Sequence, residues 1–119
     1  MGDAAGGPAS ARNVGLALAA SPLVLLLSDD ALPAPDLLAR HVSAHAELEE
    51  ASAVLGTFRF SEEARQSPFT RLLDETDLFQ HFSALRDGER YGWPFFWTSN
   101  LSAPTEVLIS VGGYDEVNF

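Results

Sequence analysis

The sequence predicts an α/β fold in which a mostly parallel sheet lies between two layers of helices. A chain of 119 residues is bounded at one domain. Five consecutive apolar residues, Leu23–Leu27, stand between Pro22 and Ser28 without polar alternation and fit a strand buried on both faces. A strand covered on both faces needs layers above and below it, which is typical of three-layer α/β proteins. A short buried helix is the alternative for these five residues.

Composition narrows the function before any motif is considered. Apolar residues make up 46% and charged residues 20%, which indicates a folded globule. Seven basic residues, all Arg, stand against 17 acidic ones, so the net charge is −10. That charge excludes simple nucleic-acid binding and disfavours docking to an anionic membrane. There is no Cys, no apolar run of the roughly 18 residues that a membrane span needs, and no secretory signal, so we expect a cytoplasmic location.

The remaining elements follow from caps, prolines and periodicity. Residues 1–8 are small and read as a loop, and Ser10 is a candidate cap for a helix over residues 11–20 that ends at Pro22. Pro35 and Asp36 begin a helix that runs to about Glu50. Further along, the sequence predicts a second strand at 52–60, short helices within 61–90, an extended segment at 91–99, a loop holding Asn100 and Ser102, and a last helix from Ala103-Pro104 that Gly112-Gly113 closes.

Two adjacent carboxylates, Asp29 and Asp30, come directly after the apolar strand. Ligands gather at the carboxyl ends of parallel strands, and carboxylate oxygens bind hard divalent cations. A bound Mg²⁺ or Mn²⁺ would let this acidic protein accept an anionic diphosphate. The alternative is a plain Asp-rich turn, which is common because Asp bonds to its own backbone.

Two histidines share one face of the predicted second helix. His41 and His45 have the i, i+4 spacing of a zinc pair, but Val42 stands where a metalloprotease motif has its Glu. The same face carries Leu38 and Leu48, so we favour amphipathic residues at a helix–sheet boundary over metal ligands.

Aromatic and acidic residues near the C-terminus are further candidates. Trp faces stack on sugar rings or line pockets, and Trp93, between Gly92 and Pro94, is the best pocket candidate in the aromatic run 91–97. Packing in the core is the alternative for each aromatic residue of this run. Asp115 and Glu116 follow the Gly112-Gly113 turn and are either solvated acids or the rim of an active site.

The order of these short motifs resembles that of family 2 glycosyltransferases. The series is Ala11-Arg12-Asn13-Val14-Gly15, the apolar strand ending in Ser28-Asp29-Asp30, Pro33 and Pro35, the helix with His41 and His45, the run Phe96 to Ser102, and Gly112-Gly113-Tyr114-Asp115-Glu116. The resemblance extends over about residues 8–119.

This resemblance implies a partial GT-A (Rossmann-like) fold, a nucleotide-sugar donor, a divalent metal, Mg²⁺ or Mn²⁺, and a carbohydrate or lipid-linked acceptor hydroxyl. Asp30 resembles the metal-binding last residue of the family's Asp-x-Asp motif and Asp29 its middle residue, while Ser28 replaces the usual first Asp. The Arg12-Asn13 pair resembles one near the donor nucleotide. Tyr114 stands where Phe is usual, and Asp115 and Glu116 match the family's acceptor-side acids as candidate catalytic residues.

The resemblance also implies that residues 1–119 are an internal part of such a domain. Family members have nucleotide-binding strands before the Arg-Asn segment, which here begins at residue 12, and a Glu-Asp motif with the catalytic base after a stretch that here ends at Phe119. We therefore expect little activity from this chain alone.

Two other functions remain open at this point. A strand that is apolar on both faces needs neighbours on both edges, so an open edge of Leu23–Leu27 predicts a non-catalytic module that pairs, for instance with itself, through that edge. A metal-dependent hydrolase is the third hypothesis, and it requires Asp29, Asp30, His41 and His45 to converge.

Overall fold

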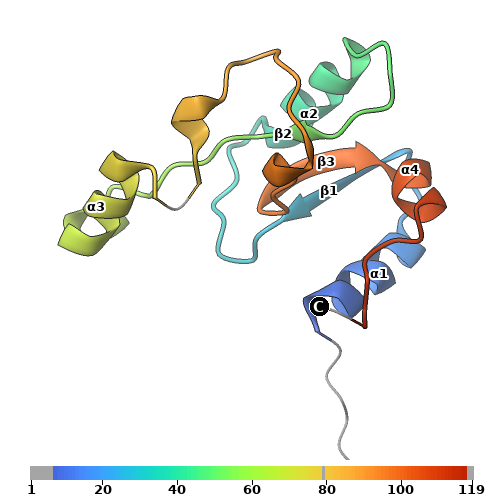
Figure 1. Cartoon of the computed structure of the whole chain (residues 1–119), viewed down its shortest axis with the longest axis horizontal. Helices are drawn as coiled ribbons and strands as arrows, with labels where there is room; N and C mark the ends of the chain where they lie inside the picture. Colours follow the sequence, from blue (N-terminus) through green and yellow to red (C-terminus); the bar gives the residue numbers. More distant parts are fainter. Residues whose placement is uncertain (1–6, 79, 118–119) are drawn as a thin grey trace, which may run out of the picture.

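The computed structural model describes residues 7–78 and 80–117 (Figure 1). Residues 1–6 of the loop predicted at 1–8, and the terminal Phe119, lie outside the described residues. In chain order the elements are α1 (Pro8–Leu18), β1 (Leu23–Leu27), α2 (Leu37–Ala46), β2 (Val54–Leu55), the 3₁₀ helix η1 (Ala64–Gln66), α3 (Pro68–Thr76), the 3₁₀ helices η2 (Phe82–Ala84) and η3 (Trp93–Phe95), β3 (Asn100–Pro104) and α4 (Thr105–Ser110).

The three strands form one sheet in the order β1-β3-β2. Both pairings are antiparallel, with Leu23 opposite Pro104 and Leu27 opposite Asn100 along β1, and Val54 opposite Ser102 along β2. The prediction of an α/β protein is therefore right, and the prediction of a mostly parallel sheet is wrong. The difference arises at β3, where the sequence predicts a loop holding Asn100 and Ser102 and a helix start at Ala103-Pro104. These residues instead form a strand that enters the sheet at the end where β1 leaves it, and the helix α4 begins at Thr105.

Helices lie on both faces of this sheet, with α2 on one side and α1 on the other (Figure 1). Side chains alternate along β3, so Leu101 and Ala103 point to one face while Asn100 and Ser102 point to the other. Leu101 and Ala103 form the apolar core, together with Leu16 of α1 and Leu108 of α4. Asn100 and Ser102 meet α2 instead, so the opposite face is polar at its centre.

Strand β1 lies where the sequence predicts it, at Leu23–Leu27, but it is an edge strand. Its first four side chains are half-buried and Leu27 is 38% exposed, so the predicted burial on both faces is wrong. Among the described residues only β3 pairs with β1. The outer edge of an apolar strand is thus left open, as the second hypothesis requires.

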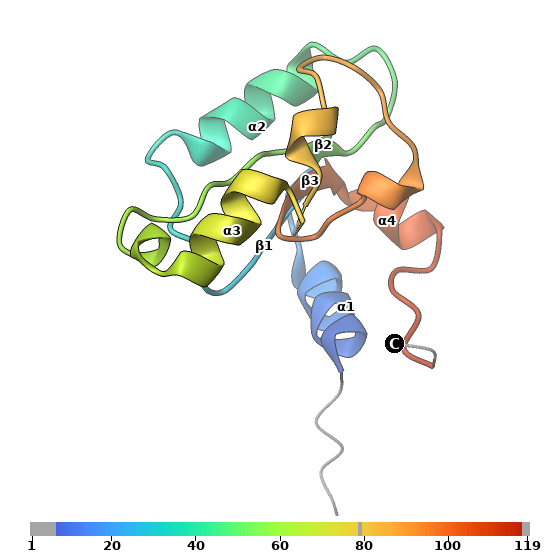
Figure 2. The ribbon, with the colours of Figure 1, turned by 60° about the vertical axis from the view of Figure 1, so that its left-hand side comes forward.

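A long excursion of the chain connects β2 to β3. Its α3 and η1 pack on each other and form a lobe beside the sheet, which comes forward in Figure 2. The predicted strand at 52–60 shrinks to Val54–Leu55, and the predicted extended segment at 91–99 contains η3 instead. Edge-to-face contacts join Trp97 to Phe82, with ring centres 5.4 Å apart, so the aromatic run forms a small cluster of its own.

The observed ends of two helices differ from the predicted ones by a few residues. Helix α1 begins at Pro8, whose missing N–H costs nothing in a first turn, so the predicted cap Ser10 lies inside the helix. Helix α2 ends at Ala46, earlier than the expected Glu50. In the described part of the chain, no helix is long and apolar enough to cross a membrane.

Candidate functional site

Two of the predicted motifs lie side by side in the structure. One is the Arg12-Asn13 pair on α1, and the other is the turn at residues 112–116, which follows α4. Residues Ala9, Arg12, Asn13 and Leu16 share one face of α1 because they are three or four positions apart. Ala9 and Leu16 are buried, which fixes this face towards the sheet. Arg12 and Asn13 are therefore carried to the segments at Thr98 and Tyr114, which lie more than 80 residues further along the chain.

Two glycines close α4 and direct the chain back to α1. Gly112 and Gly113 have φ angles of 90° and 72°, which favour glycine. The Gly113 N–H donates to the Leu108 carbonyl at 2.9 Å and ends the helix, as the sequence predicts. The turn that follows brings the backbone of Tyr114 within hydrogen-bond distance of the Asn13 side chain.

Arg12 links this turn to the segment before β3. Its Nη2 donates to Thr98 Oγ1 at 3.0 Å, and its guanidinium carbon lies 5.4 Å from the centre of the Tyr114 ring. The Tyr114 hydroxyl oxygen is buried and has no hydrogen-bond partner among the residues that the structure describes. Burial raises the pKa of Tyr114, and the Arg12 charge opposes this in part. The hydroxyl therefore stays protonated, and it is a buried hydrogen-bond donor without an acceptor among the described residues.

A cavity of about 280 Å³ opens beside Arg12 and Tyr114. Its other walls are apolar and come from α1, β1 and α4, through Gly15, Leu16, Val24, Leu25, Leu26 and Leu108. Such a combination of apolar walls and a few hydrogen-bond donors is typical of small-molecule sites. The arrangement suits a ligand with a flat or apolar body and an oxygen acceptor.

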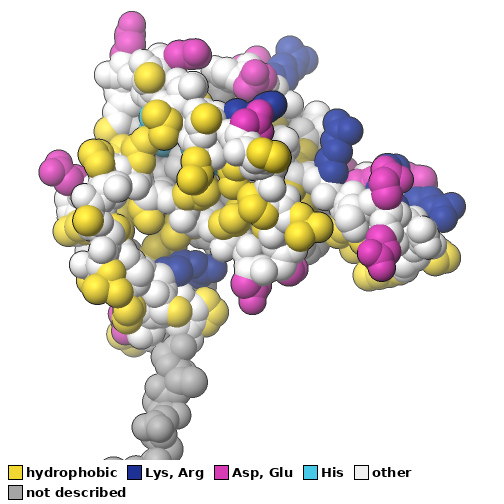
Figure 3. Space-filling model, turned by 180° about the vertical axis from the view of Figure 1, so that it is seen from behind, with side chains coloured by type: hydrophobic (Ala, Val, Ile, Leu, Met, Phe, Trp, Pro, Cys, Tyr) yellow, Lys and Arg dark blue, Asp and Glu magenta, His cyan; other side chains and the backbone are white. Residues whose placement is uncertain are grey.

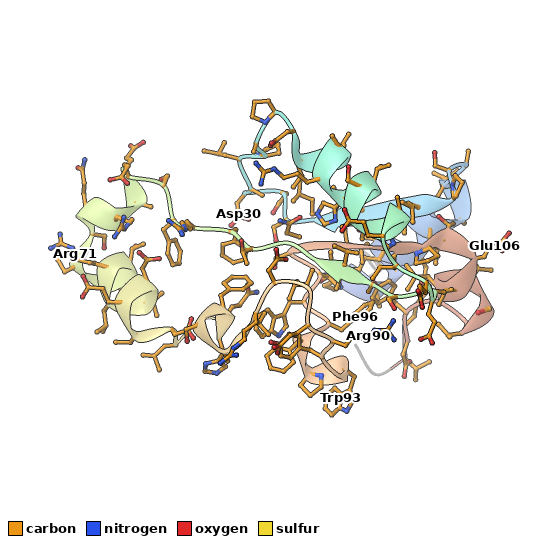
Figure 4. All side chains as sticks on the ribbon, turned by 90° about the horizontal axis from the view of Figure 1, so that it is seen from above. Asp30, Arg71, Arg90, Trp93, Phe96 and Glu106 are labelled. Atoms are coloured by element: carbon orange, nitrogen blue, oxygen red, sulfur yellow. The ribbon has the colours of Figure 1, made fainter. Side chains whose placement is uncertain are left out.

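The predicted metal ligands follow β1 at the same end of the sheet. The Ser28 N–H donates to the Ser99 carbonyl at 3.1 Å, and Ser99 follows Thr98, the partner of Arg12. Asp29 and Asp30 come next and are exposed. In Figure 4 Asp30 and Trp93 are labelled well apart, with Trp93 at the outer margin of the molecule. Trp93 is 87% exposed and does not line the cavity beside Arg12 that is described above, so its role in a pocket stays a prediction.

The donor atoms at Asp29 and Asp30 fit a divalent cation that is shared with a ligand. Two adjacent carboxylates offer the oxygen ligands that Mg²⁺ prefers. Within residues 7–78 and 80–117, no three His, Cys, Asp or Glu side chains gather as a metal cluster. Mg²⁺ commonly takes one or two carboxylates and completes its shell with phosphate oxygens and water. These residues therefore fit such an ion only together with a phosphorylated ligand.

The two histidines are structural in this arrangement. Asn100 Nδ2 donates to the Thr57 carbonyl at 3.2 Å, so Asn100 Oδ1 accepts from His41 Nε2 at 2.9 Å. His41 Nδ1 lies 2.7 Å and His45 Nε2 2.8 Å from Ser102 Oγ. Because both ring nitrogens of His41 are occupied inside the protein, the pair sits at a helix–sheet boundary, as we favoured. The described structure does not bring the four residues of the hydrolase hypothesis together as a metal cluster.

The two acids that are predicted to face the acceptor, Asp115 and Glu116, lie in the turn that Asn13 contacts. Glu116 Oε1 accepts a hydrogen bond from Asn13 Nδ2 at 2.6 Å, and Asp115 Oδ1 accepts from the Val117 N–H at 2.9 Å. Both acids are exposed. No local signal predicts that Thr98 contacts Arg12 or that Gly113 lies against Asn13, although both residues stand inside motifs that carry the resemblance.

Comparison with known proteins agrees with this convergence of motifs. The family model described as glycosyl transferase family 2 matches residues 3–110. The chain belongs to glycosyl transferase family 2. Two curated relatives are validoxylamine A glucosyltransferases of Streptomyces hygroscopicus, one from subsp. jinggangensis (strain 5008) and one from subsp. limoneus. Each is 32% identical over an alignment of 129 positions, which takes in 91% of this chain.

The matched region is a minor part of both relatives. It covers 31% of the length of the first and 28% of the second, so the chain spans about a third of the curated relatives it matches. No solved structure matches the chain.

Proposed function

We propose that this chain forms the donor-binding and acceptor-facing part of a GT-A glycosyltransferase, which moves a sugar from a nucleotide-sugar donor to an acceptor hydroxyl. The observation that carries the proposal is the junction of Arg12 and Asn13 with Thr98 and the Tyr114–Glu116 turn, at the end of β1 where Asp29 and Asp30 follow. Membership of family 2 supports the reaction class, since members use nucleotide-sugar donors.

Each side chain at this junction has a distinct part in the proposed reaction. Arg12 and the Tyr114 hydroxyl donate hydrogen bonds to oxygens of the nucleotide in the cavity between them. Asp30 would hold the divalent cation and Asp29 would orient a bound water or a sugar hydroxyl. When bound, Mg²⁺ or Mn²⁺ supplies the positive charge that stabilises a departing diphosphate. Asp115 and Glu116 orient the acceptor hydroxyl on the other side of the reacting carbon.

Nuclear magnetic resonance of the whole chain tests this proposal directly. We expect UDP- or GDP-sugar with Mg²⁺ to bind weakly, with a Kd of about 1 mM or above, because only Arg12 and Tyr114 among the cavity-lining residues offer side-chain hydrogen-bond donors. Binding should shift the amide signals of Arg12, Ser28, Asp30 and Tyr114. An Arg12→Ala variant should lose the shifts at Tyr114, whereas Arg86→Ala, in an exposed loop away from the cavity, should keep them. Titration that moves none of these signals would contradict the function.

A second function is favoured by the open edge of β1. Strand β1 carries five apolar residues and no charge, and no described strand covers its outer edge. Exposed backbone N–H and C=O groups of such an edge template the addition of another strand. Hydrophobic side chains are also widely exposed over the body of the molecule, as Figure 3 shows from behind. In this reading the chain is an interaction module that pairs with a second copy, and sedimentation as a monomer at all concentrations would contradict it.

A further inference from the structure

We propose that Asn13 is a positioning residue, whose side-chain amide fixes the Gly112–Glu116 turn and aims the Glu116 carboxylate. This differs from the role that its resemblance to a donor-side Asn implies. The use of Glu116 at the acceptor rests on the proposed function, but the positioning itself can be tested without any sugar transfer.

The hydrogen bonds of Asn13 leave its amide no N–H for a ligand. An Asn side chain offers two N–H donors and one carbonyl oxygen. Nδ2 donates to the Tyr114 carbonyl at 2.8 Å and to Glu116 Oε1 at 2.6 Å, and Oδ1 accepts the Tyr114 N–H at 2.8 Å. The backbone of Tyr114 fixes which end of the amide is oxygen, since its N–H only donates and its carbonyl only accepts. Both N–H groups of the Asn13 amide therefore donate to residues of the turn.

The turn is also shaped to receive this amide. Gly113 has a φ of 72°, and a Cβ at Gly113 would lie 2.6 Å from Asn13 Oδ1. A side chain at position 113 and the amide at position 13 cannot occupy the same space. The glycine thus lets α1 and the turn approach closely enough for three hydrogen bonds between residues about a hundred positions apart.

The polarity of the contact with Glu116 provides the sharpest test. An Asn13→Asp substitution keeps the shape but replaces Nδ2 with a carboxylate oxygen, which faces the Glu116 carboxylate and the Tyr114 carbonyl. Two carboxylates at this distance share a proton. The variant should therefore unfold at a lower temperature than the unsubstituted chain at pH 7, and the gap between them should shrink as the pH falls to about 4.5.

Matched variants separate this contact from a general effect of charge. Ala11→Asp adds the same charge to an exposed position of α1, and we expect no gap that shrinks on acidification. Glu116→Gln restores a donor opposite the new carboxylate, so adding it to Asn13→Asp should raise the midpoint at pH 7. Asn13→Ala should speed exchange of the Tyr114 amide hydrogen roughly tenfold. A pH-independent gap, or an effect of Glu116→Gln that is the same with either residue at position 13, would overturn the proposal.

A second pair of variants covers the case in which Asn13→Asp does not fold. Gly113→Ala should destabilise the chain strongly when Asn13 is present and less when Asn13 is replaced by Ala, because the clash with Oδ1 is then gone. Equal costs in the two backgrounds would show that the amide and the turn are independent, which contradicts the positioning role.

Discussion

At the scale of single residues, the structure depends on two close approaches between a glycine and an amide. One is Gly113 with Asn13, and the other is Gly56 with Asn100. A Cβ at Gly56 would overlap the Asn100 amide. That amide accepts a hydrogen bond from His41 and donates one to the Thr57 carbonyl. The Gly56 N–H also donates to the Asn100 carbonyl at 2.8 Å. The polar centre under α2 therefore depends on the absence of a side chain at position 56.

We expect Gly56→Ala to lower the free energy of unfolding by about 1–3 kcal/mol, because the Asn100 amide must move and its hydrogen bonds break. Gly15→Ala is the matched control. Gly15 lies in α1 with nothing within 4 Å of an added Cβ, so this variant should gain about 0.5–1 kcal/mol. Chemical unfolding of both variants measures the two changes. Equal effects of the two substitutions would be inconsistent with the contact.

The second prediction at this scale concerns pH and His45. Burial lowers the pKa of His45, the Ser102 contact opposes this, and the neighbouring His41 adds to it. The unfolded chain then binds more protons than the folded one below the ordinary His value of 6.5. Stability should be complete above pH 6.5 and fall as the pH drops through the folded pKa. Thermal unfolding from pH 7.5 to 5 checks this. The fall of the unfolding temperature with decreasing pH should be smaller in His45→Gln. It should be unchanged in His81→Gln, because His81 is exposed.

At the scale of elements, the sequence predicts those whose signal is local. The apolar run Leu23–Leu27 and the glycines after α4 each determine structure from adjacent residues. Pro8 also acts locally, although the sequence analysis predicts a loop there and begins the helix at residue 11. Strand β3 has no such local signal: Asn100, Ser102 and Pro104 have poor strand propensity, and the segment is a strand because its neighbours pair with it and because α1 and α2 cover it. The prediction of a parallel sheet failed with the omission of this one strand.

The same dependence on distant partners explains the site. Arg12, Asn13, Asp115 and Glu116 could be selected from the sequence because their motifs occur in a recognisable order. Their mutual contacts could not, since Asn13 and Glu116 lie 103 positions apart and meet only once α1, β3 and α4 have packed. Trp93 is the opposite case. Its turn-like sequence context made it a candidate pocket residue, but in η3 its side chain is 87% exposed.

The open edge of β1 gives the prediction that belongs to this scale. Lys on an edge strand opposes the addition of another strand. If the edge pairs with a second copy, Leu27→Lys should abolish concentration-dependent association in analytical ultracentrifugation at a small cost in stability. Leu32→Lys, at an 88% exposed position beyond the strand, should leave association unchanged. Association that survives in Leu27→Lys would place the contact elsewhere.

At the scale of the whole molecule, the core is small and the charge is high. Among the described residues, the buried hydrophobic side chains are Ala9, Leu16, Leu101, Ala103 and Leu108. The radius of gyration is 16.0 Å, against about 13–14 Å for a compact chain of this length. The α3 lobe contributes to this spread. We infer that the sheet and its three helices, rather than the molecule as a whole, hold the site together.

The net charge of −10 makes donor binding depend on salt in a defined direction. Without a divalent cation, a nucleotide diphosphate is repelled, and lower salt screens this repulsion less. The Kd for UDP should therefore rise roughly threefold between physiological and low ionic strength. With Mg²⁺ present, the rise should disappear, and Asp30→Asn should restore it whereas Asp87→Asn should not. Isothermal titration measures each Kd, and salt dependence that Mg²⁺ does not alter would contradict a metal at Asp30.

The excursion between β2 and β3 begins and ends at one hydrogen bond, from the Gly56 N–H to the Asn100 carbonyl. Because its two ends are tied together at the sheet, the stretch that holds η1 and α3 is free to lengthen, shorten or change sequence while the register of the strands stays the same. Variation among related proteins should therefore accumulate in this stretch, and a new surface loop could be grafted there without changing the contacts between α1 and the turn after α4.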